Sequence, residues 1–325
     1  MKRGIPWDAS FLHFLIGANI HGGLRIPIGV LNGQYRNMRP EMLGAQLINE
    51  LINRYDISQV DGIFCGNAVG TGGNIGRLMG LMTNLPNSVP AITVDMQCAS
   101  ALMSIEMAYT HIASGVMDSA IAGGIESSSL QPDRMYAAGD NREGLYKVAQ
   151  FSPNDCSPLA MLEGAERTIQ KHNVLKEDLY PYIIGSHKRA SEALNNPHLK
   201  SYIMPITIDG KACVDECIRP KMNEKLLSRM KPLLGKNSIT NAGNACLTHD
   251  GAAFVYVSNE KGPFRIHSIM PWAGNPQFSP EGALESTEAI LKRTGLTMDD
   301  IDVVEWNEAF AIIDVLFNKA YPKHL

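Results

Sequence analysis

Residues 92–108 of the chain read ITVDMQCASALMSIEMA, and Cys98 lies at the centre of this stretch. The residues before Cys98 alternate as in a strand, and those after it carry apolar side chains at helical spacing. A cysteine at the start of a helix faces unpaired backbone N–H groups and the positive end of the helix dipole, which favours the thiolate. The same N–H groups can hold a developing oxyanion. The stretch predicts a strand–turn–helix unit with Cys98 as a candidate nucleophile; the alternative is a buried, inert cysteine.

Strand and helix patterns alternate on both sides of this unit. They follow one another at residues 40–56 (helix), 60–70 (strand), 89–97 (strand), 101–115 (helix) and 118–129 (strand). The strand patterns are short apolar runs that end in glycines or other small residues, as buried strands do. Such alternation is typical of a layered α/β fold with largely parallel strand pairing.

Composition divides the chain into three parts. Residues 1–129 carry the first α/β pattern. Residues 130–238 are richer in Pro, Asn, Lys and Tyr and hold no run of buried strands, so we interpret them as an inserted loop domain. Residues 239–325 return to the α/β pattern with a strong apolar strand at 252–257. We expect that strand to pack with the first part.

The last part of the sequence repeats a helix–turn–strand pattern that occurs earlier in the chain. Residues 286–311 read as a helix, an acidic turn, an apolar strand over 301–306 and then Asn307. Residues 47–70 show the same order before Asn67. The repetition indicates two related halves built on one helix–strand unit.

Composition also limits the classes of function. The chain has 325 residues, of which 45% are hydrophobic, and a net charge of −4 without a basic block, which argues against a nucleic-acid partner. Six widely spaced cysteines fit a reducing, cytoplasmic compartment better than a disulfide framework. The apolar run at residues 11–18 is too short to span a bilayer, so we expect a buried strand there, with a signal peptide as the alternative, and no membrane partner. Cys213 and Cys217 lack further ligands nearby, so no metal site is expected.

Four motifs in the chain resemble those of the thiolases. They are RIPIGVLNG (25–33), the nucleophile region QCASALMSIEMA with AGGIESSS (97–108 and 122–129), NAGNACLTHDGAAFVYVS (241–258) and WNEAFA (306–311). The resemblance implies a thiolase-like layered fold of two related βαβ halves with a large inserted loop domain. It also implies that the chain forms or cleaves 3-oxoacyl-CoA, for example acetoacetyl-CoA from acetyl-CoA, with acyl-CoA as substrate, no other cofactor, and a homodimer or homotetramer as the assembly.

The resemblance also assigns site residues. Cys98 matches the nucleophile that becomes acylated, and a thiol suits such covalent catalysis. Asn307 matches the asparagine that helps to hold a catalytic water; the alternative is an amide that caps a turn. Met161 matches a methionine that lies against the acyl group, although a core methionine is an equal alternative. Cys246 replaces a serine that contacts the pantetheine chain of CoA.

Two catalytic groups of the resembling family have no counterpart in the sequence. The family places a Gly-His-Pro histidine and a second cysteine after the Asn-Glu-Ala-Phe motif. None of the nine histidines here is followed by proline, and no cysteine follows Cys246. We therefore expect an incomplete second half with impaired activation of Cys98. The alternative function is a non-catalytic CoA-binding or scaffold protein derived from a thiolase. A ketosynthase is less favoured, because its two downstream histidine motifs are missing.

Overall fold

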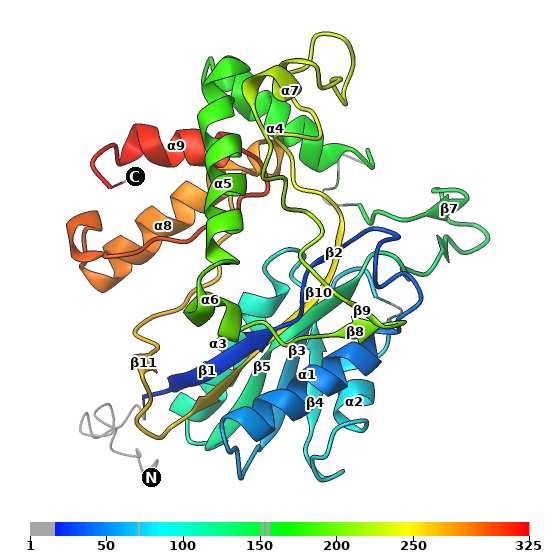
Figure 1. Cartoon of the computed structure of the whole chain (residues 1–325), viewed down its shortest axis with the longest axis vertical. Coiled ribbons are helices and arrows are strands. Elements are labelled where there is room, and N and C mark those ends of the chain that lie inside the picture. Colours follow the sequence, from blue (N-terminus) through cyan, green and yellow to red (C-terminus); the bar gives the residue numbers. More distant parts are fainter. Residues whose placement is uncertain (1–16, 71, 151–152, 154–156, 325) are drawn as a thin grey trace, which may run out of the picture.

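The computed structural model describes residues 17–70, 72–150, 153 and 157–324. Its centre is a seven-stranded sheet with the order β11-β1-β10-β5-β3-β4, in which β2 pairs with β10 as well (Figure 1). The strands span β1 (Asn19–Arg25), β2 (Gly29–Val30), β3 (Gly62–Gly66), β4 (Ala91–Val94), β5 (Ser119–Ser127), β10 (His249–Ser258) and β11 (Phe264–Arg265). The mixed α/β architecture with a central sheet is the predicted one.

Strand direction differs from the expectation of largely parallel pairing. Only β5, β3 and β4 run parallel to one another. The strand β10 returns from the long segment after β5 and pairs antiparallel with β5, β1 and β2. Parallel neighbours need a crossover connection such as a helix, whereas an antiparallel neighbour does not. The β-α-β pattern of the sequence therefore predicts strand direction correctly only as far as β5.

Helices cover both faces of the sheet. The helix α1 (Pro40–Arg54) packs against one face and α3 (Ser100–Ala113) against the other. Alternation along β3 explains this arrangement, because Ile63 and Cys65 belong to the α1 side of the core and Phe64 to the α3 side. All five residues of β3 are buried, as predicted for its apolar run. The short helix α2 (Ile75–Gly80) packs on α1 and β4.

The first strand is polar and rich in glycine. The predicted strand at residues 11–18 falls almost entirely outside the described residues, and β1 begins at Asn19. A side chain at Gly22 would collide with the ring of Tyr55 at the end of α1, and one at Gly23 would press on Val255 of β10. The two glycines therefore allow the end of α1 and the neighbouring strand to approach the β1 backbone.

A second group of helices lies beyond one end of the sheet (Figure 1). It contains α4 (Ala160–Lys171), α5 (Tyr180–Ala193), α8 (Glu281–Thr294) and α9 (Ile312–Ala320). Their apolar side chains form one cluster that joins α4 and α5, from the predicted insertion, to α9. The division at residues 130–238 stays a prediction. The remaining elements are β6 (Arg134–Met135), β7 (Leu145–Tyr146), η2 (Glu177–Leu179), α6 (Pro197–Ser201), β8 (Thr207–Ile208), β9 (Lys211–Ala212), α7 (Glu224–Ser228), η3 (Pro276–Phe278) and η4 (Met298–Asp300).

The predicted strand at residues 301–306 was wrong. The helix before it is present as α8, but the segment itself is irregular, and Val303 is 76% exposed. No described strand lies beside it to accept its backbone hydrogen bonds, and an extended segment without a partner is not a β-strand. Within the described part of the chain, no helix is long and apolar enough to cross a membrane.

Candidate active site

Cys98 lies in a tight turn between β4 and α3, two residues before the helix begins. Gln97 has a left-handed backbone with φ of 51°. Its N–H donates to Asp95 Oδ1 over 2.8 Å, and the Ser100 hydroxyl accepts from Met96 N–H and donates to Gln97 O. The turn is thus held by side chains on both sides of Cys98, and the thiol is exposed. The structure places Cys98 at the predicted junction and contradicts the buried alternative.

Close backbone packing positions the start of α3. A Cβ atom on Gly66 of β3 would lie 2.5 Å from the carbonyl carbon of Ser100. Deeper in the helix, the Ser104 hydroxyl bonds both the O and the N of Gly123 in β5, over 2.7 and 2.8 Å. These contacts leave α3 little freedom to shift, so the position of Cys98 is set by the sheet.

The loop after β3 lies beside the same turn. Asn67 N–H donates to Val94 O at the end of β4, over 3.0 Å. The carboxylate of Glu126, from the AGGIESSS motif, accepts from Ala68 N–H and Val69 N–H over 2.9 Å each, and from the Asn67 side chain. The carboxyl ends of β3, β4 and β5 therefore meet around Cys98, as expected at one edge of parallel strands.

The NACL and NEAFA motifs pair with each other. Cys246 N–H donates to Ala309 O over 2.8 Å, and Ala311 N–H donates to Asn244 O over 3.0 Å. These hydrogen bonds join the segment that contains Cys246 to the segment that contains Asn307. Asn307 is exposed, and its backbone O accepts from Ala309 N–H over 2.7 Å. Its assignment as a water-holding amide stays a prediction.

The exposed Cys98 thiol influences the pKa of the exposed Cys246 thiol. Crowding by protein atoms raises the pKa of the Cys246 thiol, and the charge of nearby Cys98 raises it further. The fold thus brings the turn before α3 close to the segment before β10. Cys246 favours its neutral thiol there, so it suits a contact role better than nucleophilic attack.

Met161 lies in the first turn of α4. It is half-buried against the cluster that α4 shares with α5 and α9. This environment agrees with the alternative of a core methionine, while a contact with an acyl group stays a prediction.

A cavity of about 420 Å³ opens beside Cys246, and we call it the thiol cavity. It is lined by Tyr182, Ile183, Ser186, His187, Ala190, Cys217, Ile218, Arg219, Met222, Met230, Ala242, Gly243, Asn244, Ala245, Cys246, Leu247, His249, Glu308, Ala311 and Asp314. A wider hollow shares Arg219, Met222 and Met230 with it and adds Lys221 and Arg229; we call this the basic mouth. The sequence did not predict the cavity, because its walls come from distant segments of the chain.

One wall of the thiol cavity is acidic. Glu308 accepts from the Ser186 hydroxyl over 2.6 Å and pairs with Arg189 over 3.3 Å. Asp314 is buried, accepts from Trp306 Nε1–H over 3.3 Å, and lies close to Glu308. Burial, together with the charge of Glu308, raises the pKa of Asp314 to about 7. Across the described residues, no group of three or more His, Cys, Asp or Glu side chains is placed to hold a metal ion.

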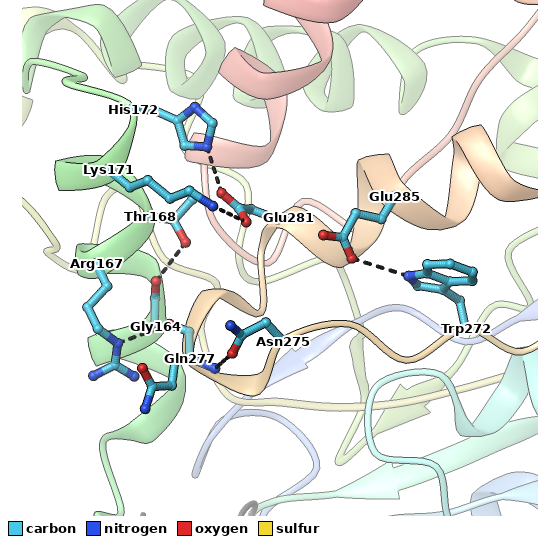
Figure 2. A network of polar contacts seen from close by, with 10 residues as sticks. All are labelled: Gly164, Arg167, Thr168, Lys171, His172, Trp272, Asn275, Gln277, Glu281 and Glu285. Atoms are coloured by element: carbon cyan, nitrogen blue, oxygen red, sulfur yellow. Dashed lines mark hydrogen bonds and ion pairs between the residues drawn. The ribbon is translucent and has the colours of Figure 1, made fainter.

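A network on the other side of the turn holds the loop before α8 against α4. Glu281 bonds Lys171 Nζ over 2.8 Å and His172 Nε2 over 2.7 Å, and Arg167 Nε donates to Gln277 O over 2.9 Å (Figure 2). Trp272 Nε1 donates to Glu285 over 3.3 Å. The loop and the exposed face of α3 enclose a cleft of about 470 Å³, which includes Met96 and Ala99 on either side of Cys98.

The class of thiolase-like α/β proteins is defined by three features of this structure. They are a sheet flanked by α1 and α3, an exposed cysteine before α3, and a covering group of helices. A family model described as the thiolase N-terminal domain matches residues 18–261. The chain belongs to the thiolase family.

Individual relatives agree with this assignment. A protein of Staphylococcus epidermidis RP62A named "Putative acetyl-CoA C-acetyltransferase VraB" is 32% identical over 303 residues, which cover 88% of this chain and 78% of that protein. Its counterpart of the same name in Staphylococcus aureus MW2 is 30% identical over 302 residues, with 88% and 79% covered. The crystal structure of the Bacillus anthracis acetyl-CoA acetyltransferase has the same fold, with a TM-score of 0.86, 24% identity, and 94% of this chain and 83% of that chain covered.

Proposed function

We propose that the protein transfers acyl groups to and from CoA through an acyl-Cys98 intermediate, and thereby forms or cleaves 3-oxoacyl-CoA such as acetoacetyl-CoA. The observation that carries this proposal is the exposed Cys98 thiol before α3, which lies near Cys246, a lining residue of the thiol cavity. Membership of the family and the names of the relatives support the same class of reaction.

The thiol cavity and the basic mouth suit a CoA thioester. Pantetheine is a narrow, mostly apolar chain with two amides, and Met222 and Met230 line both spaces. Arg219, Lys221 and Arg229 at the mouth carry positive charge that the CoA phosphates require. A CoA bound in this way extends its sulfur toward Cys246 and Cys98.

The chemistry follows from the position of Cys98. The thiolate attacks the thioester carbonyl, and the backbone N–H groups at the start of α3 stabilise the oxyanion. The carbon–sulfur bond to CoA then breaks, and the acyl group stays on Cys98. In the proposal, Asn307 orients a water near the substrate oxygen, Cys246 contacts the pantetheine chain, Met161 contacts the acyl group, and no cofactor other than the CoA substrate takes part.

The second candidate is a non-catalytic CoA-binding or scaffold protein. The observation that favours it is that the lining of the thiol cavity includes Cys246 but not Cys98. Such a protein would bind CoA in the same cavity without acylation of Cys98.

We also propose a cytoplasmic homodimer, or a homotetramer built from it. The strand β4 lies at the edge of the sheet, and Ile92 is 41% exposed there. An unpaired edge strand that leads directly to the Cys98 turn is a natural surface for a second copy of the chain.

Intact-mass measurement after incubation with acetyl-CoA tests the function. We expect one acetyl adduct per chain, located at Cys98 by peptide mass, together with release of CoA. The adduct should be absent in Cys98→Ala and present in the matched control Cys246→Ser, which keeps the contact that a serine makes in the family. CoA binding without an adduct in the wild type would favour the second candidate, and turnover to acetoacetyl-CoA would exclude it.

A further inference from the structure

Two histidines line the thiol cavity, and they differ in what their rings can do. His187 Nδ1 accepts a hydrogen bond from Arg219 N–H over 3.3 Å. Its neutral form therefore carries its proton on Nε2 and has no free acceptor. His249 Nε2, in contrast, is buried and has no hydrogen-bond partner among the described residues.

The environment of the His249 ring favours its neutral form. Burial lowers its pKa, and the neighbouring carboxylate of Asp250 raises it only partly. That carboxylate is already occupied, because it accepts from Ser129 N–H over 2.9 Å and from the Ser129 hydroxyl over 2.5 Å. A neutral imidazole with an unpartnered nitrogen next to a cavity can both accept and donate a proton.

The other described histidines are placed differently. His21, His111, His172, His198 and His324 each have a ring nitrogen within hydrogen-bond or ion-pair distance of another residue, and His267 is exposed. His249 alone, in the described part of the chain, combines a buried unpartnered nitrogen with a cavity that Cys246 lines.

We propose that His249 is the general base and acid for the thiols of this site: it accepts the proton of Cys98 and returns it to the departing sulfur of CoA. The proposal rests on the proposed function. In the forward step the Cys98 S–H bond breaks and the proton moves to His249. The Cys98 sulfur bonds the acyl carbon, the bond from that carbon to the CoA sulfur breaks, and the CoA thiolate takes the proton from His249. Protons and electron pairs balance without a further reactant.

Other titratable and charged groups face the same cavity and belong to the electrostatic environment of His249. They are Tyr182, His187, Cys217, Arg219, Cys246, Glu308 and Asp314, with Asp250 beside the ring and Cys98 beyond Cys246. The test must therefore separate His249 from its neighbours by substitution.

The rate of Cys98 alkylation by iodoacetamide, followed by peptide mass from pH 5 to 9, tests the proton transfer without acyl chemistry. In the wild type we expect a limb with a midpoint below pH 6.5, the ordinary value for histidine. His249→Asn and His249→Gln should lose this limb and alkylate roughly 10² times more slowly near neutral pH, the low end of general-base effects. The exposed His198→Gln on α6 is the matched control and should behave as the wild type.

Acylation by acetyl-CoA and chemical rescue complete the test. His249→Ala should acylate slowly, and added imidazole should restore its rate, which a structural role of the side chain would not explain. The proposal is overturned if the wild type shows no alkylation limb below pH 6.5, if the His249 variants match the wild type within twofold, or if imidazole restores nothing. An alkylation limb that depends on His249, without any acetyl adduct on Cys98, would refute the proposed function and leave the base in place.

Discussion

Gly66→Ala is the substitution that tests how the sheet positions the nucleophile. The added Cβ would lie 2.5 Å from Ser100 C and 2.6 Å from Ala101 N, whereas ordinary contacts begin at 3.4 Å. Both neighbours are backbone atoms at the start of α3, so no side chain can rotate away. The start of α3 must then move by about 0.9 Å, and overpacking of this kind costs about 1–3 kcal/mol of folding free energy.

The same displacement should reach the chemistry. Cys98 lies immediately before the segment that must move, and a misplacement of about 1 Å costs on the order of 10²-fold in rate. Urea unfolding followed by circular dichroism measures the loss of stability, and the rate of acetyl-Cys98 formation measures the displacement. Gly282→Ala in α8 is the matched control: nothing lies within 4 Å of its Cβ position, so the unfolding free energy should stay within about 0.5 kcal/mol of the wild type. A Gly66→Ala protein with wild-type stability and acylation rate would refute the described contact between β3 and α3.

Three further predictions concern charged groups. Arg25→Ala should lower the free energy of unfolding in urea by about 3 kcal/mol at pH 7, because Asp215 loses the guanidinium that binds both of its oxygens over 2.8 Å. Hydrogen bonds from Arg25 outweigh burial and lower the pKa of Asp215, so this difference in stability should shrink as the pH falls below about 4. Glu281→Gln should cost about 1 kcal/mol by the same assay at pH 7. The difference should fade below about pH 4, since the hydrogen bonds from Lys171 and His172 outweigh burial and lower the pKa of Glu281. Asp314→Asn should stabilise the fold by about 1–3 kcal/mol at pH 8. The pKa of Asp314 is about 7 in the folded state and about 3.9 in the unfolded state, so the wild type loses stability as the pH rises between these values, and the two proteins should have equal stability at pH 4. Equal unfolding free energies at pH 8 would contradict the burial of the Asp314 carboxyl.

The local elements could be predicted because their signals are local. Helical spacing of apolar residues marked α1, α3 and α8, and short apolar runs marked β3, β4, β5 and β10. The direction of β10 could not be predicted in this way, because the pairing of a strand that returns after a long segment depends on which edge of the sheet is open. The prediction of a strand at residues 301–306 was wrong for a related reason. The composition of this segment suits a strand, but a β-strand exists only beside a partner strand.

The sequence by itself determined the family, through four motifs in order, and the place of Cys98 between a strand and a helix. Only the tertiary structure decided what surrounds that thiol. Cys246 reaches it because two segments more than sixty residues apart in the chain pair at Ala245 and Phe310. His249 faces a cavity because α5 and the segment around Arg219 close over the start of β10. Periodicity and helix signals are short-range properties of the chain, whereas a cavity and the protonation of groups inside it depend on how distant segments pack.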